Sequence, residues 1–489
     1  MKASATRPGP ASPTRWKNLA SPPPGTKDSD GDGFGDIASA QVTCPAPAGY
    51  VDNAADCNDA EAAVNPEATE ICGDVIDNDC DAVVDETCPP ACGAALVQPE
   101  GTILSQLQAG HGFVANSGGG SPHNVNDTTD FAIGTQSAWI ETDGAGTAKT
   151  LKKNALGTFD FTGKMPRLWV KLDDPTKAAT LQLYLGNNNL ADQYKFSFNS
   201  TQGQQWTTDG DWVAFSMSWS SKTLSTVGSP NRAAITDVQL RAIDTATGDP
   251  VRVHANQFSM VDEPAGYPNG VISFTFDDGF ASQYTLAKPI LDGYGYPGTA
   301  YVIVEDVATT NYMTLSQLTD LQSSSGWEIG YHSYDADIHT VGFPDTPVGD
   351  LEYDVDSGRA WLYNNGFEGH CDCAYPHGAF TGSTDVLSVM HAKLSACRTV
   401  HQKHREAFPP SDPYKLRVLL VTKPVTVATV EAAIDQAKLN KEWIILVFHN
   451  FTSTPVSNDD YDPADFQQIV DYVNTVGMPV TTVGDLIIP

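Results

Sequence analysis

The spacing of apolar residues changes near Gly270, and this change constrains the fold more than any other feature of the sequence. After it, short apolar runs alternate with amphipathic stretches of helical period. Such alternation predicts a parallel β-sheet with helical connections, open or closed into a barrel. We expect strands near 271–276, 299–304, 328–331, 373–375, 398–400, 443–448 and 480–483, and helices near 281–294, 314–323, 347–364, 383–393, 427–439 and 463–475.

Before this region the chain has three segments that differ in residue composition and apolar pattern, so the 489 residues divide into several domains. Residues 1–26 form a polar, Pro-rich arm, and residues 27–92 form a small module rich in Cys and Asp. Residues 93–268 contain short alternating stretches at 167–172, 180–185 and 212–217, separated by turn signals, which predicts an antiparallel β-sandwich, jelly-roll-like in texture. The alternating β/α region then covers 269–489.

The formal net charge of −32 argues against nucleic acid and anionic lipid as partners. No apolar run reaches the roughly 18 residues that a membrane span needs. From Lys27 to Cys92 sixteen Asp or Glu stand against one Lys, so about half of the excess charge lies in this short module.

Carboxylates and imidazoles occur where three of the expected parallel strands end. Asp277 and Asp278 precede Gly279 after the first strand, His332 ends a later strand, and His449 follows the apolar run 443–448. Active sites of such sheets gather at the carboxyl ends of the strands. Together these residues favour a metal-assisted hydrolase.

Five segments occur here in the order of the motifs of one family. They are Thr275-Phe-Asp-Asp-Gly279, His332-Ser333, Tyr375-Pro-His-Gly378, Lys415-Leu-Arg417 and Leu446-Val-Phe-His449. Over about 271–488 the chain therefore resembles the NodB-type polysaccharide deacetylases, carbohydrate esterase family 4. The resemblance implies a distorted (β/α)7 barrel and removal of acetyl groups from a polysaccharide.

The same resemblance implies a role for each matching residue. Asp277 would be the general base, held by Arg417, and His449 would be the general acid. The backbone N–H of Tyr375 would face the developing oxyanion. Asp278 and His332 would bind a divalent metal, usually zinc.

The third metal ligand is where this sequence departs from the family. The family has His or Asp four residues after the motif histidine, and that position is Ala336 here. We rank His339 first as the replacement because imidazole matches the family ligand, Asp337 second and Asp335 third. The alternative is a site with two protein ligands and a degenerate barrel. His377, in place of an aromatic residue, is a milder departure.

The nine cysteines indicate an oxidising compartment, because six of them lie between Cys44 and Cys92. Cys397 is expected to pair with Cys371 or Cys373, with free thiols as the alternative. Export to the cell surface, the medium or the periplasm is therefore favoured, although residues 1–25 contain no apolar stretch typical of a signal peptide.

Carboxylates alternate with other residues in the acidic module, as in the first half of an EF-hand loop. The runs are Asp28, Asp30, Asp32 and Asp36, then Asp77, Asp79, Asp81 and Asp85, with Asp56 and Asp59 as a third candidate. The segment 28–86 resembles the MopE-type metal-binding repeat of bacterial surface proteins. We expect calcium to stabilise it, since so few apolar residues cannot form a core.

The sandwich contains five tryptophans that are either core residues or a sugar-stacking platform, Trp139, Trp169, Trp206, Trp212 and Trp219. Our leading hypothesis is an exported, zinc-dependent enzyme that removes N-acetyl, or O-acetyl, groups from an acetylated polysaccharide. The alternative is a surface glycan-binding protein with an inactive barrel. A purely structural, calcium-organised adhesin ranks last, because it leaves the strand-end residues unexplained.

Overall fold

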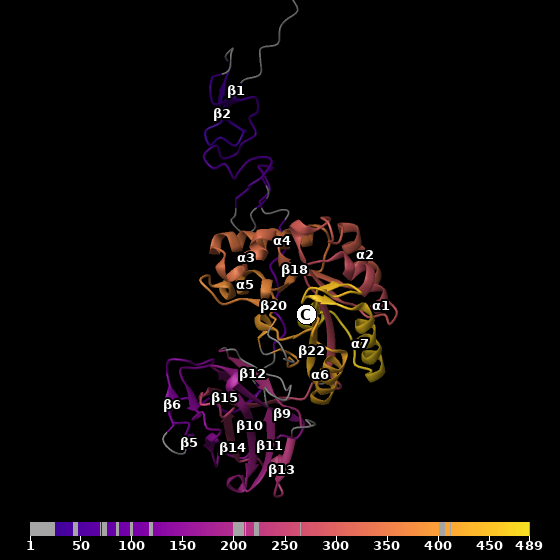
Figure 1. Ribbon diagram of the computed structural model, residues 1–489. Coiled ribbons are helices and arrows are strands. Elements are labelled where there is room, and N and C mark those ends of the chain that lie inside the picture. The colour runs from indigo at the N-terminus through magenta and orange to yellow at the C-terminus, as the bar shows by residue number, and fades with distance from the viewer. Residues whose placement is uncertain are drawn as a thin grey trace, which may run out of the picture. The chain divides into compact units, whose positions relative to one another are not determined.

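The computed structural model describes residues 25–42, 47–68, 70, 76–84, 88–97, 101–116, 121–198, 210, 212–219, 224–264, 266–400, 406–410 and 412–488. The chain divides into two compact units, Met1–Cys88 and Pro89–Pro489 (Figure 1). Most of the arm expected over 1–26 lies outside the described residues.

The first unit has very little apolar interior. Its strands β1 (Gly25–Lys27), β2 (Asp36–Gln41) and β3 (Tyr50–Val51) form an antiparallel sheet in the order β2-β1-β3. Val64 is the single buried hydrophobic side chain among the unit's described residues. The disulfide Cys57–Cys80 joins two of its loops, so cross-links replace the core that the sequence lacks.

The second unit begins with antiparallel sheets, as expected for residues 93–268. One sheet has the order β13-β11-β10-β14-β8-β5, and the other has the order β12-β9-β15-β7-β6, with β4 pairing with β15. Alternate residues such as Leu168, Val170 and Leu172 face the common core. The bounds are β4 Thr102–Ser105, β5 Val114–Asn116, β6 His123–Asp127, β7 Ser137–Glu141, β8 Lys149–Lys153, β9 Lys164–Leu172, β10 Ala178–Asn187, β11 Asp192–Phe198, β12 Val213–Ser216, β13 Leu224–Val227, β14 Asp237–Asp244 and β15 Arg252–Asp262.

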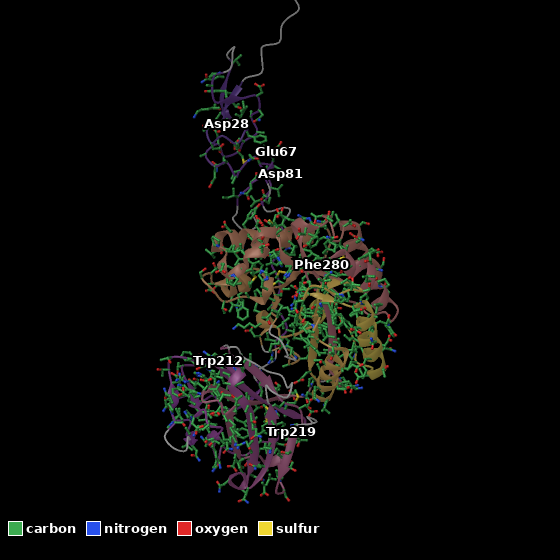
Figure 2. All side chains as sticks on the ribbon, in the orientation of Figure 1. Asp28, Glu67, Asp81, Trp212, Trp219 and Phe280 are labelled. Atoms are coloured by element: carbon green, nitrogen blue, oxygen red, sulfur yellow. A yellow bond between two sulfur atoms is a disulfide. The ribbon has the colours of Figure 1, made fainter. Side chains whose placement is uncertain are left out.

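Two of the tryptophans behave differently in this sandwich (labelled in Figure 2). Trp219 packs edge-on against Phe161 and Phe196, and its Nε1 donates to the Lys164 carbonyl, so it is a core residue. Trp212 is half-buried and its Nε1 donates to Asp130. Trp206 lies outside the described residues.

The C-terminal part contains a curled sheet of seven parallel strands, in the order β20-β19-β18-β17-β16-β22-β21. A single bridge between Arg398 and Leu416 links the β20 edge to the segment before β21. The strands are β16 Val271–Phe276, β17 Thr299–Ile303, β18 Glu328–Ser333, β19 Gly369–Ala374, β20 Ala396–Arg398, β21 Leu419–Leu420 and β22 Trp443–Phe448, followed by the small pair β23 Asn450–Phe451 and β24 Asp460–Tyr461.

Helices cover the outer face of this sheet (Figure 1). Phe274, Phe276 and Phe448 point outward from the strands into this layer and meet Phe466 of the covering helices. The helices are α1 Lys288–Asp292, α2 Leu315–Ser325, α3 Ala336–Val341, α4 Val348–Asn364, α5 Val386–Lys393, α6 Val427–Asn440, α7 Pro463–Val476 and α8 Gly484–Ile487. None of the helices in the described residues has the length and apolar character needed to cross a membrane.

One expected element was wrong, and one differs in its winding. Residues 480–483 make only one bridge, Ile272 to Val480, and the chain then turns into α8, whose Leu486 and Ile487 are buried. The seventh strand is β21 instead. The helix expected over 281–294 is present over 281–292, where the central residues Gln283–Ala287 are wound as a π-helix and α1 follows. Pro289 lacks the N–H that a continuous α-helix would need, which favours this change of winding.

Candidate active site

The expected strand-end residues lie at one edge of the parallel sheet. Asp277 and Asp278 directly follow β16, His332 lies near the end of β18, and His449 directly follows β22. The strands β18, β17, β16 and β22 are consecutive neighbours. Because parallel strands end at the same edge, these side chains converge.

Asp278, His332 and His339 form a compact group whose ligand atoms all lie within 4.8 Å of one another. Nε2 of His332 is 3.5 Å and Nε2 of His339 is 3.4 Å from Oδ1 of Asp278. These separations exceed ordinary hydrogen-bond lengths. They equal the spacing of about 3.4 Å expected between tetrahedral ligands that each lie about 2.1 Å from zinc.

Of the candidates for the third position, His339 is the one that lies in this group with Asp278 and His332. Of the candidates weighed from the sequence, Asp337 is exposed on the first turn of α3 and stands outside the group. Asp335 is the N-cap of α3, where it accepts from the backbone N–H groups of Asp337 and Ile338 at 2.6 and 3.2 Å. The short helix α3 thus brings an imidazole to this group three residues after Ala336.

The surrounding backbone orients side chains of this group. Nδ1 of His332 is 2.8 Å from the carbonyl of Ala374 on β19, which fixes the ring with Nε2 toward Asp278. Asp278 adopts a φ of 69°, a conformation that is costly for a residue with a side chain and that recurs at functional sites.

The three side chains of this group shift one another's pKa values. Burial alone would raise the pKa of Asp278, but the imidazoles of His332 and His339 hold it well below its usual range. Burial opposes protonation of His332, yet Asp278 and Asp277 raise its pKa. For His339 burial prevails and lowers the pKa. A buried carboxylate beside two imidazoles fits the donor set of zinc.

Asp277 lies next to the group and is 2% exposed. Its Oδ1 pairs with the guanidinium of Arg398, at the end of β20, and its Oδ2 lies 3.6 Å from Nε2 of His449. Nδ1 of His449 is buried and makes no hydrogen bond within the described part of the chain. The arrangement links a carboxylate, a fixed cation and an imidazole.

The arginine expected to hold Asp277 was wrong. Arg417 lies before β21 and forms a buried pair with Glu406, at 3.0 and 2.6 Å. Arg398 takes its place because β20 ends opposite the end of β16, across the barrel interior. The sequence signal was present, since Arg398 is a charged residue within an expected strand, but no motif pointed to it.

The oxyanion donor expected from the sequence was also wrong. The backbone N–H of Tyr375 donates to the carbonyl of Arg398 at 3.0 Å, within the pairing of β19 and β20. The N–H of His377, two residues later, has no acceptor among the described residues. His377 has a φ of 56°, and its ring centroid lies 5.5 Å from that of His339.

The acidic module has its own groups of carboxylates. Asp28, Asp30 and Asp32 form one group, and Asp30, Asp56 and Asp59 form another, each with ligand atoms within 4.8 Å. Asp36 accepts from the Ala38 N–H and stands outside both groups. The two groups share Asp30, so the first loop and the segment around Asp56 meet at one place.

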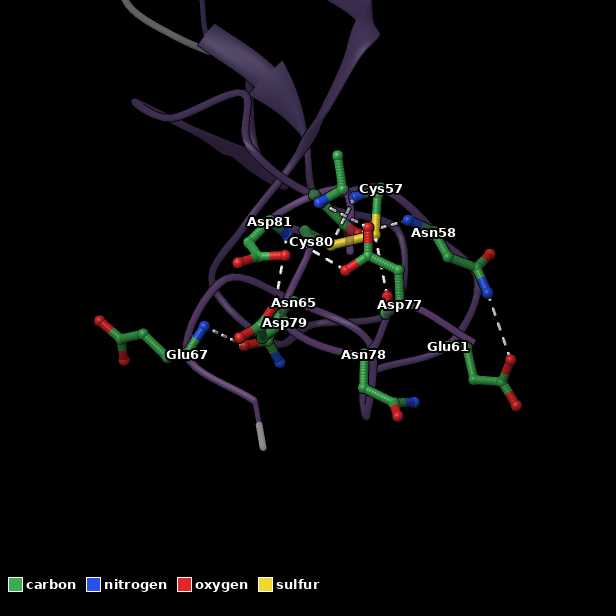
Figure 3. Close-up of a disulfide and its surroundings, with 12 residues drawn as sticks. Cys57, Asn58, Glu61, Asn65, Glu67, Asp77, Asn78, Asp79, Cys80 and Asp81 are labelled. Carbon is green, nitrogen blue, oxygen red and sulfur yellow. Dashed lines mark hydrogen bonds between the residues drawn. A yellow bond between two sulfur atoms is a disulfide. The ribbon is translucent and has the colours of Figure 1, made fainter. Parts of the chain in front are cut away.

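A third group lies beside the disulfide Cys57–Cys80 (Figure 3). It consists of Glu70, Asp77 and Asp79, of which Glu70 was not expected from the sequence. Asp81 accepts the N–H of Val83 and is not part of the group. The remaining expected ligand, Asp85, lies outside the described residues.

Comparison with known families agrees with both resemblances. The polysaccharide deacetylase family model matches residues 265–389, and the model of the MopE-type metal-binding motif matches residues 56–86. Each match covers only its own part of the chain.

One curated relative is the poly-β-1,6-N-acetyl-D-glucosamine N-deacetylase of Staphylococcus epidermidis, 24% identical over 176 residues. The aligned residues make up 34% of this chain and 60% of that protein. Among solved structures, the family 4 acetyl xylan esterase of Clostridium thermocellum with a cobalt ion is 17% identical. The match covers 44% of this chain and 89% of the esterase chain, with a TM-score of 0.30. A family 4 carbohydrate esterase of Bacillus anthracis is 17% identical, with 45% and 82% coverage and a TM-score of 0.29.

Proposed function

We propose that residues 269–489, which include nearly all of the polysaccharide deacetylase match over 265–389, form a metal-dependent deacetylase that hydrolyses N-acetyl groups of a polysaccharide. The observation that supports this most is the group Asp278, His332 and His339 directly beside Asp277 and His449. A degenerate barrel would need no such convergence of side chains from separate strands and a helix.

Asp278, His332 and His339 would hold a zinc-like ion. Its chemistry when bound is Lewis acidity, which polarises the acetyl carbonyl and acidifies a water molecule. The buried Nε2 of His339, which makes no hydrogen bond within the described residues, supports this reading. Three protein ligands leave an open position, as catalytic zinc sites require.

Asp277 would act as the general base and His449 as the general acid. Arg398 fixes Oδ1 of Asp277, so Oδ2 remains to accept the proton of the attacking water. The imidazolium of His449 would then give a proton to the departing amine nitrogen, which is a poor leaving group without it. The 3.6 Å contact between His449 and Asp277 keeps acid and base in one cluster.

The N–H of His377 would stabilise the oxyanion in place of the N–H of Tyr375. A preorganised backbone donor is effective because it costs no reorganisation during the reaction. The free N–H and the neighbouring ring of His339 support the assignment. Glycan amides are favoured over esters as substrates, because the curated relative is described as an N-deacetylase.

The disulfides Cys92–Cys371 and Cys373–Cys397 support action outside the reducing cytosol, on an extracellular or periplasmic polysaccharide. The second of them is one of the two pairings expected for Cys397.

The test is acetate release from N- and O-acetylated glycans by the zinc-loaded protein, with and without chelator. We expect chelator to abolish acetate release. Asp277→Asn should retain zinc, but its rate of release should be at least about 100-fold below that of wild type. His339→Ala should lose zinc. Asp337→Ala is the matched control and should keep both zinc and activity, since Asp337 is exposed. Zinc binding with no release from any acetylated glycan would reject the proposal.

We further propose that the acidic module binds a hard cation such as Ca²⁺ where its first acidic loop, around Asp30, meets the segment around Asp56. Asp30, Asp32 and Asp56 each keep one buried carboxylate oxygen that makes no hydrogen bond among the described residues. Burial, and then repulsion from Asp32, Asp30 and Asp59, raises the pKa of Asp56. Oxygen ligands at this density suit calcium.

Calorimetry would test the calcium site in the intact protein. Asp56→Asn should weaken calcium binding about tenfold or more, because it removes a buried charged ligand. Asp52→Asn, which changes an exposed carboxylate of the same unit, should leave the affinity unchanged. Equal affinities in the two variants would remove Asp56 from the ligand set.

A further inference from the structure

The disulfide Cys373–Cys397 joins two neighbouring strands beside the candidate active site. Cys373 on β19 and Cys397 on β20 are direct partners in the parallel pairing of the two strands. Both side chains are completely buried in the outer core of the sheet. The next residues of the two strands, Ala374 and Arg398, are also paired with each other.

Each of these next residues serves the candidate site. The carbonyl of Ala374 accepts from His332 Nδ1, and the guanidinium of Arg398 pairs with Asp277. Because successive side chains of a strand point to opposite faces, the disulfide lies behind the sheet while Arg398 points into the barrel. One covalent link therefore supports the backbone behind a metal ligand and behind the base.

The strand that carries Arg398 is short, and it pairs with β19 over three residues. β20 has three residues, and within the described part of the chain a single β-bridge, from Arg398 to Leu416, joins its outer edge to the rest of the sheet. The backbone bonds there are Leu416 N–H to Cys397 and Thr399 N–H to Leu416, at 3.2 and 3.0 Å. Few ladder hydrogen bonds fix the register of so short a strand, and the disulfide adds a covalent link to the same pairing.

We infer that the disulfide Cys373–Cys397 is a positioning element of the active site, which keeps Arg398 aligned with Asp277 and the Ala374 carbonyl aligned with His332. This inference rests on the proposed deacetylase function. It predicts that loss of the disulfide lowers turnover and zinc affinity beyond what the loss of stability explains.

The chain offers a matched control in the disulfide Cys92–Cys371. It joins the same strand β19, two residues before Cys373, to the segment before the sandwich, and it closes a loop of 279 residues against 24 for Cys373–Cys397. In the chain-entropy model the longer loop gives the larger stabilisation. A purely structural view thus predicts the larger loss of function when Cys92–Cys371 is removed, and the positioning role predicts the reverse.

The experiment compares Cys373→Ala/Cys397→Ala with Cys92→Ala/Cys371→Ala in the full-length protein, at a temperature below both Tm values. We expect kcat and zinc affinity to fall about tenfold in the first pair and to stay near wild type in the second, although the second pair has the lower Tm. Cys373→Val/Cys397→Ala, which refills the buried volume, is used if the first variant does not fold.

A second readout is the double-mutant cycle with Arg398→Lys. If the disulfide acts through Arg398, its removal should lower kcat much less in the Arg398→Lys background than in wild type. Unchanged kcat and zinc affinity in the first pair, or full additivity with Arg398→Lys, would overturn the inference. A wild-type protein without deacetylase activity would instead reject the proposed function, and the zinc affinities would still decide whether the disulfide supports His332.

Discussion

Arg398 and Arg417 show at the scale of single residues how two buried arginines of one domain can have different roles. Arg398 pairs with the candidate base Asp277, whereas Arg417 makes a two-pronged pair with Glu406. Both side chains are almost entirely buried. The first is expected to govern turnover and the second to govern stability.

Replacing each arginine by lysine tests this division, because lysine keeps the charge and loses the planar fork. Arg398→Lys should lower kcat by about 10- to 100-fold. Arg417→Lys should leave kcat unchanged and lower the free energy of unfolding by about 2 kcal/mol, since lysine keeps the charge but cannot make both buried hydrogen bonds to Glu406. Denaturant unfolding and acetate release measure the two effects, and a larger loss of kcat in Arg417→Lys would restore the motif-based assignment.

Glu328 is a second residue with a measurable effect, at the start of β18. Burial raises the pKa of Glu328 to about 7, against the opposing hydrogen bonds from the Gly484 N–H and Thr299. A carboxyl with a raised folded pKa favours the folded state when protonated. Its contribution is therefore present below the unfolded value of 4.5 and is lost as the pH rises toward 7.

Glu328→Gln should remove this pH dependence, because glutamine stays neutral and can accept the same bonds. The stability of the variant relative to wild type should rise by roughly 1 kcal/mol per pH unit between the two pKa values and level off above them. Urea unfolding at several pH values measures it. A difference that is constant with pH would show that Glu328 ionises normally in the folded protein.

At the scale of elements, the short helix α3 positions His339, the proposed third metal ligand. It has six residues and begins at the N-cap Asp335, which accepts two backbone N–H groups. So short a helix is not stable without its cap and its tertiary contacts. His339 is on its second turn, so the position of this ligand depends on the cap.

Asp335→Ala should weaken zinc binding about tenfold, because the loss of the cap loosens α3. The matched control is Asp462→Ala at α7, where the N-cap accepts the Ala464 N–H at 2.8 Å and no ligand follows. Both changes should lower stability by about 1 kcal/mol. Zinc affinities that fall equally in the two variants would argue against a specific role of the α3 cap.

At the scale of the whole molecule, the second unit begins before the sandwich with the segment 89–97. Hydrogen bonds and a disulfide bind this segment to the parallel sheet domain. Arg359 donates to the Pro90 carbonyl, Ser395 to the Gly93 carbonyl, and the Leu96 N–H to the Ile487 carbonyl. Cys92 adds the disulfide to Cys371. The segment 89–97 therefore belongs structurally to the C-terminal domain, although it precedes the sandwich in sequence.

Two truncations test this organisation. Removing residues 1–88 should leave the unfolding transition of the remaining unit and its kcat unchanged, because the cut falls between the two compact units. Removing residues 1–97 should lower Tm, since the disulfide and three hydrogen bonds are lost. Calorimetry distinguishes the two, and equal Tm values would show that the segment does not stabilise the domain.

The sequence by itself determined the architecture and most of the candidate site. The parallel and antiparallel regions were predicted from local periodicity. A strand buried on both faces is a continuous apolar run, whereas a strand buried on one face alternates apolar and polar residues. Asp277, Asp278, His332 and His449 were found because each follows or ends an apolar strand. The spacing of Asp28, Asp30 and Asp32 likewise indicated a grouping that the structure contains.

Only the tertiary structure decided which side chains meet across elements. The pairing of Asp277 with Arg398, the exclusion of Arg417 and the engagement of the Tyr375 N–H all depend on how β20 lies against β19 and faces β16. The choice of His339 over Asp337 depends on the direction in which a six-residue helix leaves β18. Contacts between residues distant in sequence are set by packing and strand register, which local patterns in the chain do not encode.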